Sequence, residues 1–271
     1  MRQEFGHRVG IAGFPGGAEG GDRRCGQRGS RGGGARDRHW NLSWERIECS
    51  LDKSSLMEEV KRKSARSYGQ FCGLARSLDV VGDRWSLLVV RELLPGPMRY
   101  GELVASLGGI ATNLLADRLR SLESCGVIER RLAASGGVVY ALTPRGGELR
   151  ETVEALIRWS FPLMVSGRGG DAFQPRWLAV ALPALLRGRT AESPIELGIE
   201  VADLFLTVRI DKDGPHLTLH PDRCPDTILE AEPEVVLGLA AGAIGIDDAL
   251  GQASVHGDPR VVTTVLAGAQ T

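Results

Sequence analysis

The chain has 271 residues, of which 42% are hydrophobic and 25% are charged, and its formal net charge is −1. This length allows one large domain or two of ordinary size. No apolar run reaches the roughly 20 residues that a membrane-spanning helix needs, which excludes a membrane-spanning protein. The Arg- and Gly-rich start also lacks the apolar core of a secretory signal, so we expect a cytoplasmic protein.

Charge is distributed unevenly along the chain. The balance is +4 over residues 1–65, +3 over residues 66–170 and −8 over residues 171–271. A basic first part joined to an acidic last part is typical of a nucleic-acid-binding module followed by a module of another kind. The five cysteines form no close pair and no Cys/His cluster, so we expect no structural zinc, no disulfide framework and no cofactor.

Residues 1–56 are rich in glycine and arginine and show no apolar periodicity. Such a segment cannot bury enough apolar surface to offset its backbone entropy, which predicts a disordered leader. Two other interpretations stay open. The segment could be a basic arm that binds nucleic acid, or it could be translated sequence upstream of a true start at Met57.

Residues 66–166 are predicted to form a first domain that begins with four helices. Leucines and valines recur at helical spacing from Leu74 to Val81 and again from Asp83 to Leu94, where Asp83 is a plausible N-cap and Pro95 ends the second helix. A short third helix over residues 100–107 and a fourth over residues 112–125 are separated by a Gly-Gly turn. A short helix, a glycine turn and a helix with a polar exposed face indicate a helix-turn-helix.

The residues that follow decide the type of helix-turn-helix. Residues 127–132 and 138–143 alternate like strands around a small, Gly-rich turn, which predicts a β-hairpin that forms a wing. A single helix is expected from Pro144 to about Leu163, with Pro144 at its first position. Its apolar face is suited to a dimer contact.

Residues 70–161 resemble the HxlR-type winged-helix regulators, which are related to the MarR group. The resemblance rests on residues 71–79, on Val81-Gly82-Asp83-Arg84-Trp85-Ser86, on residues 93–103, on Asn113-Leu114-Leu115-Ala116-Asp117-Arg118-Leu119 and on residues 140–146. It implies a homodimeric, sequence-specific transcriptional regulator that binds double-stranded DNA.

In a winged helix, the first turns of the recognition helix face the base edges. We therefore expect Thr112, Asn113 and Asp117 to contact bases, and Arg118 and Arg120 to contact bases or phosphates. An alternative for Arg118 is a salt bridge with Glu102 or Glu123. The predicted phosphate and minor-groove contacts are Arg130 and Arg131 on the wing and Arg99 and Tyr100 at the start of the third helix.

Cys72 occupies a position where HxlR-type proteins often carry a cysteine, and some members resemble thiol-based sensors. A sensing thiol needs a lowered pKa and access to solvent, and Arg76 one turn later could supply the first. The alternative is an inert, partly buried cysteine at a dimer contact.

Residues 171–271 are predicted to form a second, α+β domain after a Gly-rich linker. A helix over residues 177–186 precedes strands, two helices, a further strand at residues 253–256 and a last helix from Asp258, with Asp213-Gly214 marking a hairpin turn. The element order and the motifs at residues 231–237 and 254–259 resemble the sterol-carrier-protein-like fold, which curls a sheet around an apolar tunnel. That resemblance implies a cavity for a hydrophobic ligand bordered by Val235, Leu239, Val261 and Val265, which otherwise belong to an ordinary core.

The sequence contains no nucleophile motif, phosphate loop or metal-ligand set, so we expect no enzyme activity. The leading hypothesis is a dimeric DNA-binding regulator whose second domain responds to a hydrophobic small molecule. Two alternatives stay open: a redox-responsive regulator that acts through Cys72, with a purely structural second domain, and a lipid-handling protein.

Overall fold

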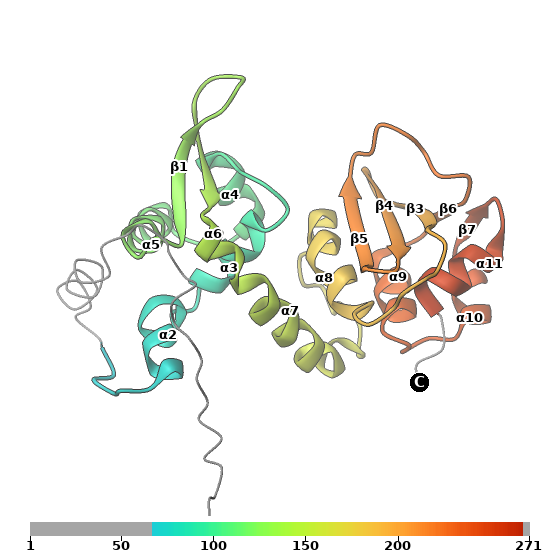
Figure 1. Ribbon diagram of the computed structural model, residues 1–271, viewed down its shortest axis with the longest axis horizontal. Coiled ribbons are helices and arrows are strands. Elements are labelled where there is room, and N and C mark those ends of the chain that lie inside the picture. The colour runs from blue at the N-terminus through green and yellow to red at the C-terminus, as the bar shows by residue number, and fades with distance from the viewer. Residues whose placement is uncertain (1–66, 268–271) are drawn as a thin grey trace, which may run out of the picture. The chain divides into compact units, whose positions relative to one another are not determined.

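The computed structural model describes residues 67–267, which are drawn in colour in Figure 1. The expected leader over residues 1–56 lies outside the described residues. Within residues 67–267, no helix is both long and apolar enough to cross a membrane.

The first part of the described chain contains the four expected helices. The carboxylate of Asp83 accepts hydrogen bonds from the backbone N–H groups of Trp85, at 2.9 Å, and Ser86, at 3.1 Å, and so caps the second helix as the sequence predicts. Gly108 and Gly109 both adopt positive φ in the turn between the third and fourth helices, where a side chain would be strained. The helices are α2 (Gly73–Val81), α3 (Ser86–Leu93), α4 (Tyr100–Leu107) and α5 (Thr112–Ser124).

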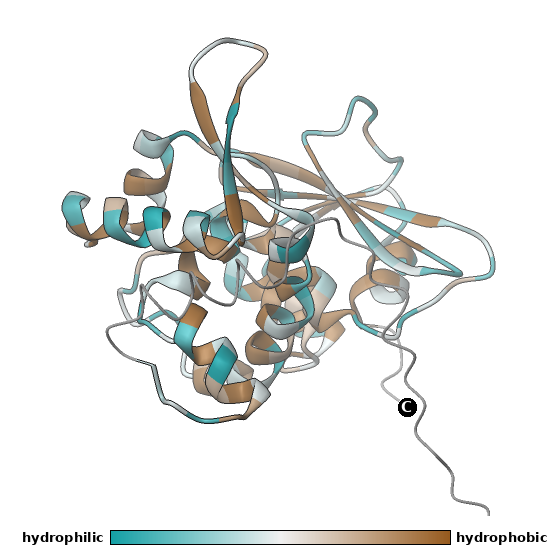
Figure 2. Ribbon diagram, turned by 60° about the vertical axis from the view of Figure 1, so that its left-hand side comes forward, coloured by the Kyte–Doolittle hydropathy of each residue, from teal (hydrophilic) through white to brown (hydrophobic). Residues whose placement is uncertain are grey.

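The predicted wing is present as an antiparallel hairpin of β1 (Ile128–Leu132) and β2 (Val138–Leu142). Figure 2 shows the contrast between its strands, since β1 is largely hydrophilic and β2 largely hydrophobic. Met98 extends the hairpin by exchanging two backbone hydrogen bonds with Tyr140, of 3.0 and 2.8 Å. This bridge ties the N-terminal end of α4 to the base of the wing.

The single helix expected after Pro144 is divided, so that prediction was wrong in detail. The structure has α6 (Pro144–Gly147), α7 (Leu149–Ser160) and the 3₁₀ turn η2 (Phe161–Met164). Gly146 and Gly147 are poor helix formers. Gly146 also packs against the carbonyl oxygen of Val127, and an added Cβ would lie 2.0 Å from that atom. This tertiary contact fixes α6 against the start of the wing.

The last part of the chain forms a five-stranded sheet with strand order β5-β4-β3-β6-β7. Neighbouring strands are antiparallel except for β3 and β6, which are parallel. The strands are β3 (Ile195–Val201), β4 (Leu204–Asp211), β5 (Gly214–Leu219), β6 (Ile228–Glu230) and β7 (Ser254–His256).

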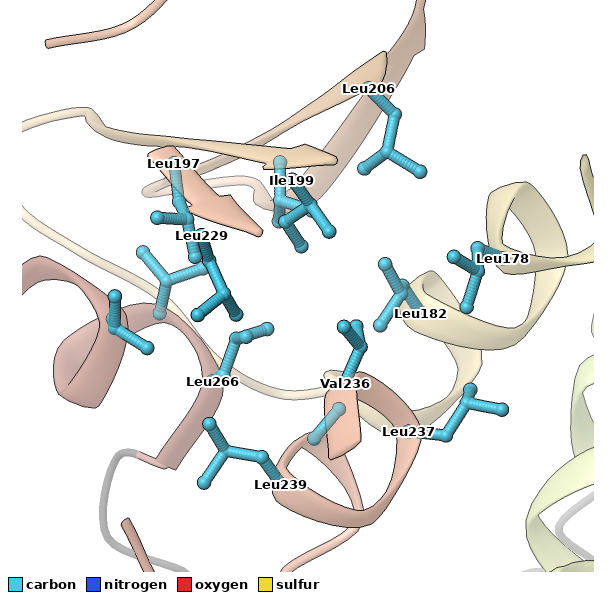
Figure 3. Packing of buried hydrophobic residues seen from close by; sticks show 14 of the residues in the cluster. Leu178, Leu182, Leu197, Ile199, Leu206, Leu229, Val236, Leu237, Leu239 and Leu266 are labelled. Carbon is cyan, nitrogen blue, oxygen red and sulfur yellow. The ribbon is translucent and has the colours of Figure 1, made fainter. Parts of the chain in front are cut away.

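One face of this sheet is apolar and is covered by helices. Leu197, Ile199 and Leu229 point from the strands toward Val236 and Leu266 on the helical side (Figure 3), and all five are at most 1% exposed. The other face carries charged and hydroxyl side chains. The helical segments after η2 are the 3₁₀ turn η3 (Pro175–Trp177), α8 (Leu178–Leu185), α9 (Pro233–Ala240), α10 (Ile246–Leu250), α11 (Pro259–Val262) and the π-helical turn η4 (Thr263–Ala267).

A buried carboxylate on α3 joins the helix-turn-helix to a much later segment. Glu92 is 1% exposed and accepts hydrogen bonds from the indole N–H of Trp177 at 2.8 Å, from the hydroxyl of Ser106 at 2.5 Å and from Nε of Arg91 at 3.0 Å. The guanidinium of Arg91 also lies 4.0 Å from the centre of the Trp177 ring. A buried charge is tolerated only when it is paired and hydrogen-bonded, and Glu92 meets that condition.

Candidate nucleic-acid interface

The helix α5 has one buried face and one polar, exposed face. Leu115, Leu119 and Leu122 are at most 2% exposed and anchor the helix in the core. The exposed face carries four of the predicted DNA-contacting residues, Thr112, Asn113, Asp117 and Arg120. The packing of the leucines therefore sets the orientation of this polar face.

Two charges on this face neutralise each other in the free protein. Asp117 and Arg120, one turn apart, form an exposed ion pair. Such an exposed pair contributes little stability, so breaking it costs little.

The structure places Arg118 apart from that exposed face. Its guanidinium pairs with Asp83, with a nitrogen-to-oxygen distance of 3.3 Å, and its Nε is buried without a hydrogen-bond partner. The partner is neither of the residues expected from the sequence, Glu102 and Glu123, because Glu102 caps α4 and Glu123 pairs with the wing. Arg118 thus links α5 to the loop before α3.

Tyr100 and Arg99 connect α4 and the residue before it to α5 and to the turn of the wing. The hydroxyl of Tyr100 donates to the carbonyl oxygen of Thr112 at 2.6 Å, which joins α4 to the first turn of α5. The guanidinium of Arg99 donates to Ser135 Oγ at 3.0 Å and to the carbonyl oxygen of Gly136 at 2.8 Å in the wing turn. Sequence reasoning did not predict these contacts, since each joins residues that are far apart in the chain.

The wing presents two exposed arginines. Nε of Arg130 donates to Glu123 at 2.8 Å, and this hydrogen bond is the main cause that raises the pKa of Arg130. Nε of Arg131 donates to Glu129 at 2.6 Å. More than half of each arginine side chain is exposed, so both remain accessible to a phosphate backbone.

Cys72 is exposed at the N-terminal end of α2 in the single chain. Backbone hydrogen bonding from Ala75 and then Leu74 lowers the pKa of its thiol. Arg76, which the sequence suggested as the cause, instead pairs with Asp79 at 3.5 Å.

The four residues proposed to border a ligand cavity lie in or against the core of the sheet domain. Val235, Leu239 and Val265 are 6%, 1% and 0% exposed, and Val261 packs against them partly buried. Of these, Val265 also lines a hollow of about 340 Å³ beside the loop after α8.

The winged-helix part is similar to known regulators. Residues 80–165 match the model of the HxlR-like helix-turn-helix family. The Escherichia coli regulator YtfH is 30% identical over 111 residues, which cover 40% of this chain and 86% of YtfH. The chain belongs to the HxlR-like helix-turn-helix family.

Other relatives of this HxlR-like protein are also named as transcriptional regulators. An uncharacterised regulator of Synechocystis sp. is 38% identical over 90 residues, which cover 32% of this chain and 67% of the relative. Among solved structures, quinone-bound YodB of Bacillus subtilis is 27% identical and aligns with 33% of this chain and 96% of its own, with a TM-score of 0.30. The family match ends at residue 165, before the five-stranded sheet begins.

Proposed function

We propose that this HxlR-like protein is a sequence-specific DNA-binding regulator that acts as a homodimer. The observation that carries the proposal is the polar, exposed face of α5 beside a wing with two exposed arginines. Thr112, Asn113, Asp117 and Arg120 contact base edges in the major groove, and Arg130 and Arg131 contact phosphates. Arg99, Tyr100 and Arg118 hold these elements in place, and any contact they make with DNA is secondary.

The proposal of a homodimer rests on a second observation. Large apolar side chains are exposed on α7 and η2, among them Trp159 at 75% and Leu163 at 76%, and on α2 and the residues before it, where Leu74 is 68% exposed. A monomer rarely leaves so much apolar surface in water. A second copy of the chain buries these faces and presents two α5 helices to a two-fold-related site.

For residues 171–271, we propose a sterol-carrier-like module that binds a hydrophobic small molecule and modulates DNA binding. Two observations support this module. Its one sheet has a single apolar face that helices cover, and the net negative charge of residues 171–271 does not favour binding to DNA. Glu92, with its contacts to Ser106 on α4 and Trp177 before α8, offers a physical link from this module to the helix-turn-helix.

A second candidate site for the regulation of DNA binding is the thiol of Cys72. Its exposure and lowered pKa are the features that an oxidant-responsive cysteine requires. In that case DNA binding changes on oxidation, with or without a ligand on the second module.

The experiment is selection of bound sequences from random duplex DNA with the full-length protein under reducing conditions. We expect enrichment of a two-fold-related site with a steep salt dependence. Arg131→Ala weakens binding to all sequences and lowers the log–log salt slope by about 1, whereas Arg187→Ala, an exposed arginine after α8, is the matched control and changes neither.

Two further variants separate the parts of the proposal. Asn113→Ala alters the selected sequence at one position of each half-site, because the residue lies on the exposed face of α5. Trp159→Ser in the apolar face of α7 gives single half-sites in place of two-fold sites. Absence of any enriched sequence with the wild-type protein, reduced or oxidised, would contradict a DNA-binding regulator.

A further inference from the structure

The end of the wing exposes two large apolar side chains to water. Leu132 is 83% exposed and Val138 is 49% exposed, and the two residues lie directly opposite each other where β1 and β2 meet the turn. Residues 133–137, which form that turn, are small and uncharged. The wing projects from the helices around its base (Figure 1), so the apolar pair lies on an accessible part of the surface.

Hydrogen bonds hold the turn of the wing in one conformation. The backbone N–H of Ala133 donates to the carbonyl oxygen of Gly137 at 2.9 Å, and that of Gly136 donates to Ala133 at 2.8 Å. The guanidinium of Arg99 adds its two contacts with Ser135 and Gly136. It approaches closely because a Cβ at Gly137 would lie 2.6 Å from its nitrogen. A surface whose shape is already fixed loses little conformational entropy when it binds a partner.

The surroundings of the apolar pair favour a polyanion as the partner. Side chains two residues apart on a strand share a face, so Leu132 follows Arg130 on the face of β1 that contacts Glu123 of α5. Residues 130–142 contain no acidic side chain. Within residues 67–267, Arg99 forms no ion pair, so its charge beside the turn is not neutralised. The apolar pair is therefore continuous with the residues proposed to contact DNA.

We propose that the end of the wing enters the minor groove beside each half-site, where Leu132 and Val138 pack against the sugars and the base edges. The inference rests on the proposed DNA-binding function and deepens it, because it assigns an apolar contact to the end of the wing. Apolar side chains that enter a minor groove unstack and kink the duplex, and pyrimidine–purine steps deform most easily. The apolar pair thus selects DNA that flanks the half-site by its deformability.

The test compares the full-length protein with Leu132→Ser, by selection from random duplex DNA and by fluorescence anisotropy on the selected duplex over a salt series. Leu132 is largely exposed, so its replacement removes no core contact. We expect binding to weaken by about tenfold, because apolar burial is lost. The log–log salt slope should stay the same, because no cation is lost. The wild-type protein should select pyrimidine–purine steps beside each half-site, and the variant should lose that preference but keep the half-site.

Three further variants separate apolar burial from other effects. Leu132→Met keeps a large apolar side chain and should bind like the wild-type protein. Val138→Thr exchanges a methyl group for a hydroxyl group and should weaken binding in the same direction as Leu132→Ser. Ala134→Ser is the matched control, since it adds a hydroxyl group to the same turn without removing a large apolar side chain, and it should leave binding unchanged.

The outcomes separate this inference from the proposed function. Equal affinity and equal flanking preference for the wild-type protein and Leu132→Ser overturn the inference and leave a DNA-binding regulator in place. A lower salt slope for Leu132→Ser would assign the loss to displaced arginines and would also overturn it. If Leu132→Ser dissociates the dimer in analytical ultracentrifugation without DNA, the pair belongs to a contact between two copies of the chain. A wild-type protein that binds no DNA overturns the proposed function and this inference together.

Discussion

Cys72 shows how a backbone arrangement sets the chemistry of one residue. Backbone hydrogen bonding from Ala75 and Leu74 at the start of α2 stabilises the thiolate and lowers the pKa of the thiol. The thiolate therefore forms at a lower pH than in an ordinary cysteine, so the rate of alkylation rises with pH and levels off earlier.

We predict that iodoacetamide modifies Cys72 faster than Cys224 near pH 7. Both cysteines are exposed, which makes Cys224 the internal control for access to solvent. Mass spectrometry of the two peptides over a pH series measures the rates. Equal rates at every pH would show that the end of α2 does not activate Cys72.

At the scale of elements, the contact between α6 and the start of the wing should be sensitive to a single methyl group. A Cβ at Gly146 would lie 2.0 Å from the carbonyl oxygen of Val127, which also accepts a hydrogen bond from the backbone N–H of Thr143 at 3.1 Å. Because the obstacle is backbone, it cannot move aside as a side chain would. We predict that Gly146→Ala lowers the free energy of unfolding by about 2–4 kcal/mol.

Gly147→Ala is the matched control for this prediction. It lies in the same short helix, but an added Cβ would meet no atom within 4 Å. Alanine also favours a helix more than glycine does, so this variant should be neutral or slightly stabilising. Urea unfolding of both variants measures the difference, and equal stabilities would rule out the steric explanation.

The elements that local pattern specifies could be predicted from the sequence. Leu115, Leu119 and Leu122 define α5, and the alternating residues on both sides of a Gly-rich turn define the wing. The break between α6 and α7 and the bridge between Met98 and Tyr140 could not be predicted, because they depend on tertiary contacts. The sequence predicted which residues lie on the exposed face of α5. It did not predict that Arg118 pairs with Asp83.

At the scale of the whole described chain, Glu92 is the residue that sequence reasoning missed. It lies in a helix with apolar spacing, where a charge at such a position is usually exposed, and its partner Trp177 is 85 residues away. The only local signal was an acidic residue between Arg91 and Leu93 in an otherwise apolar run. Near this contact, one of the two hydrophobic clusters of the described residues includes Val180 of α8 together with residues of α3 and α5.

This junction predicts how the protein unfolds. Shared buried contacts make the winged helix and the sheet domain unfold together, so the wild-type protein should show one transition in calorimetry. Glu92→Ala removes the acceptor shared by Trp177 and Ser106 and leaves Arg91 without its carboxylate, which should lower stability by about 3–5 kcal/mol. We expect that loss to divide unfolding into two transitions.

Trp177→Phe tests the same junction with a smaller change. It keeps an aromatic ring beside Phe173 but removes the indole N–H that reaches Glu92, and it should cost about 1.5–3 kcal/mol. Arg223→Ala, which breaks the exposed pair with Glu196 on the sheet, is the control and should leave a single transition. If Glu92→Ala also unfolded in one transition, the coupling would reside in the packing of α7 against α8 and not in the buried carboxylate.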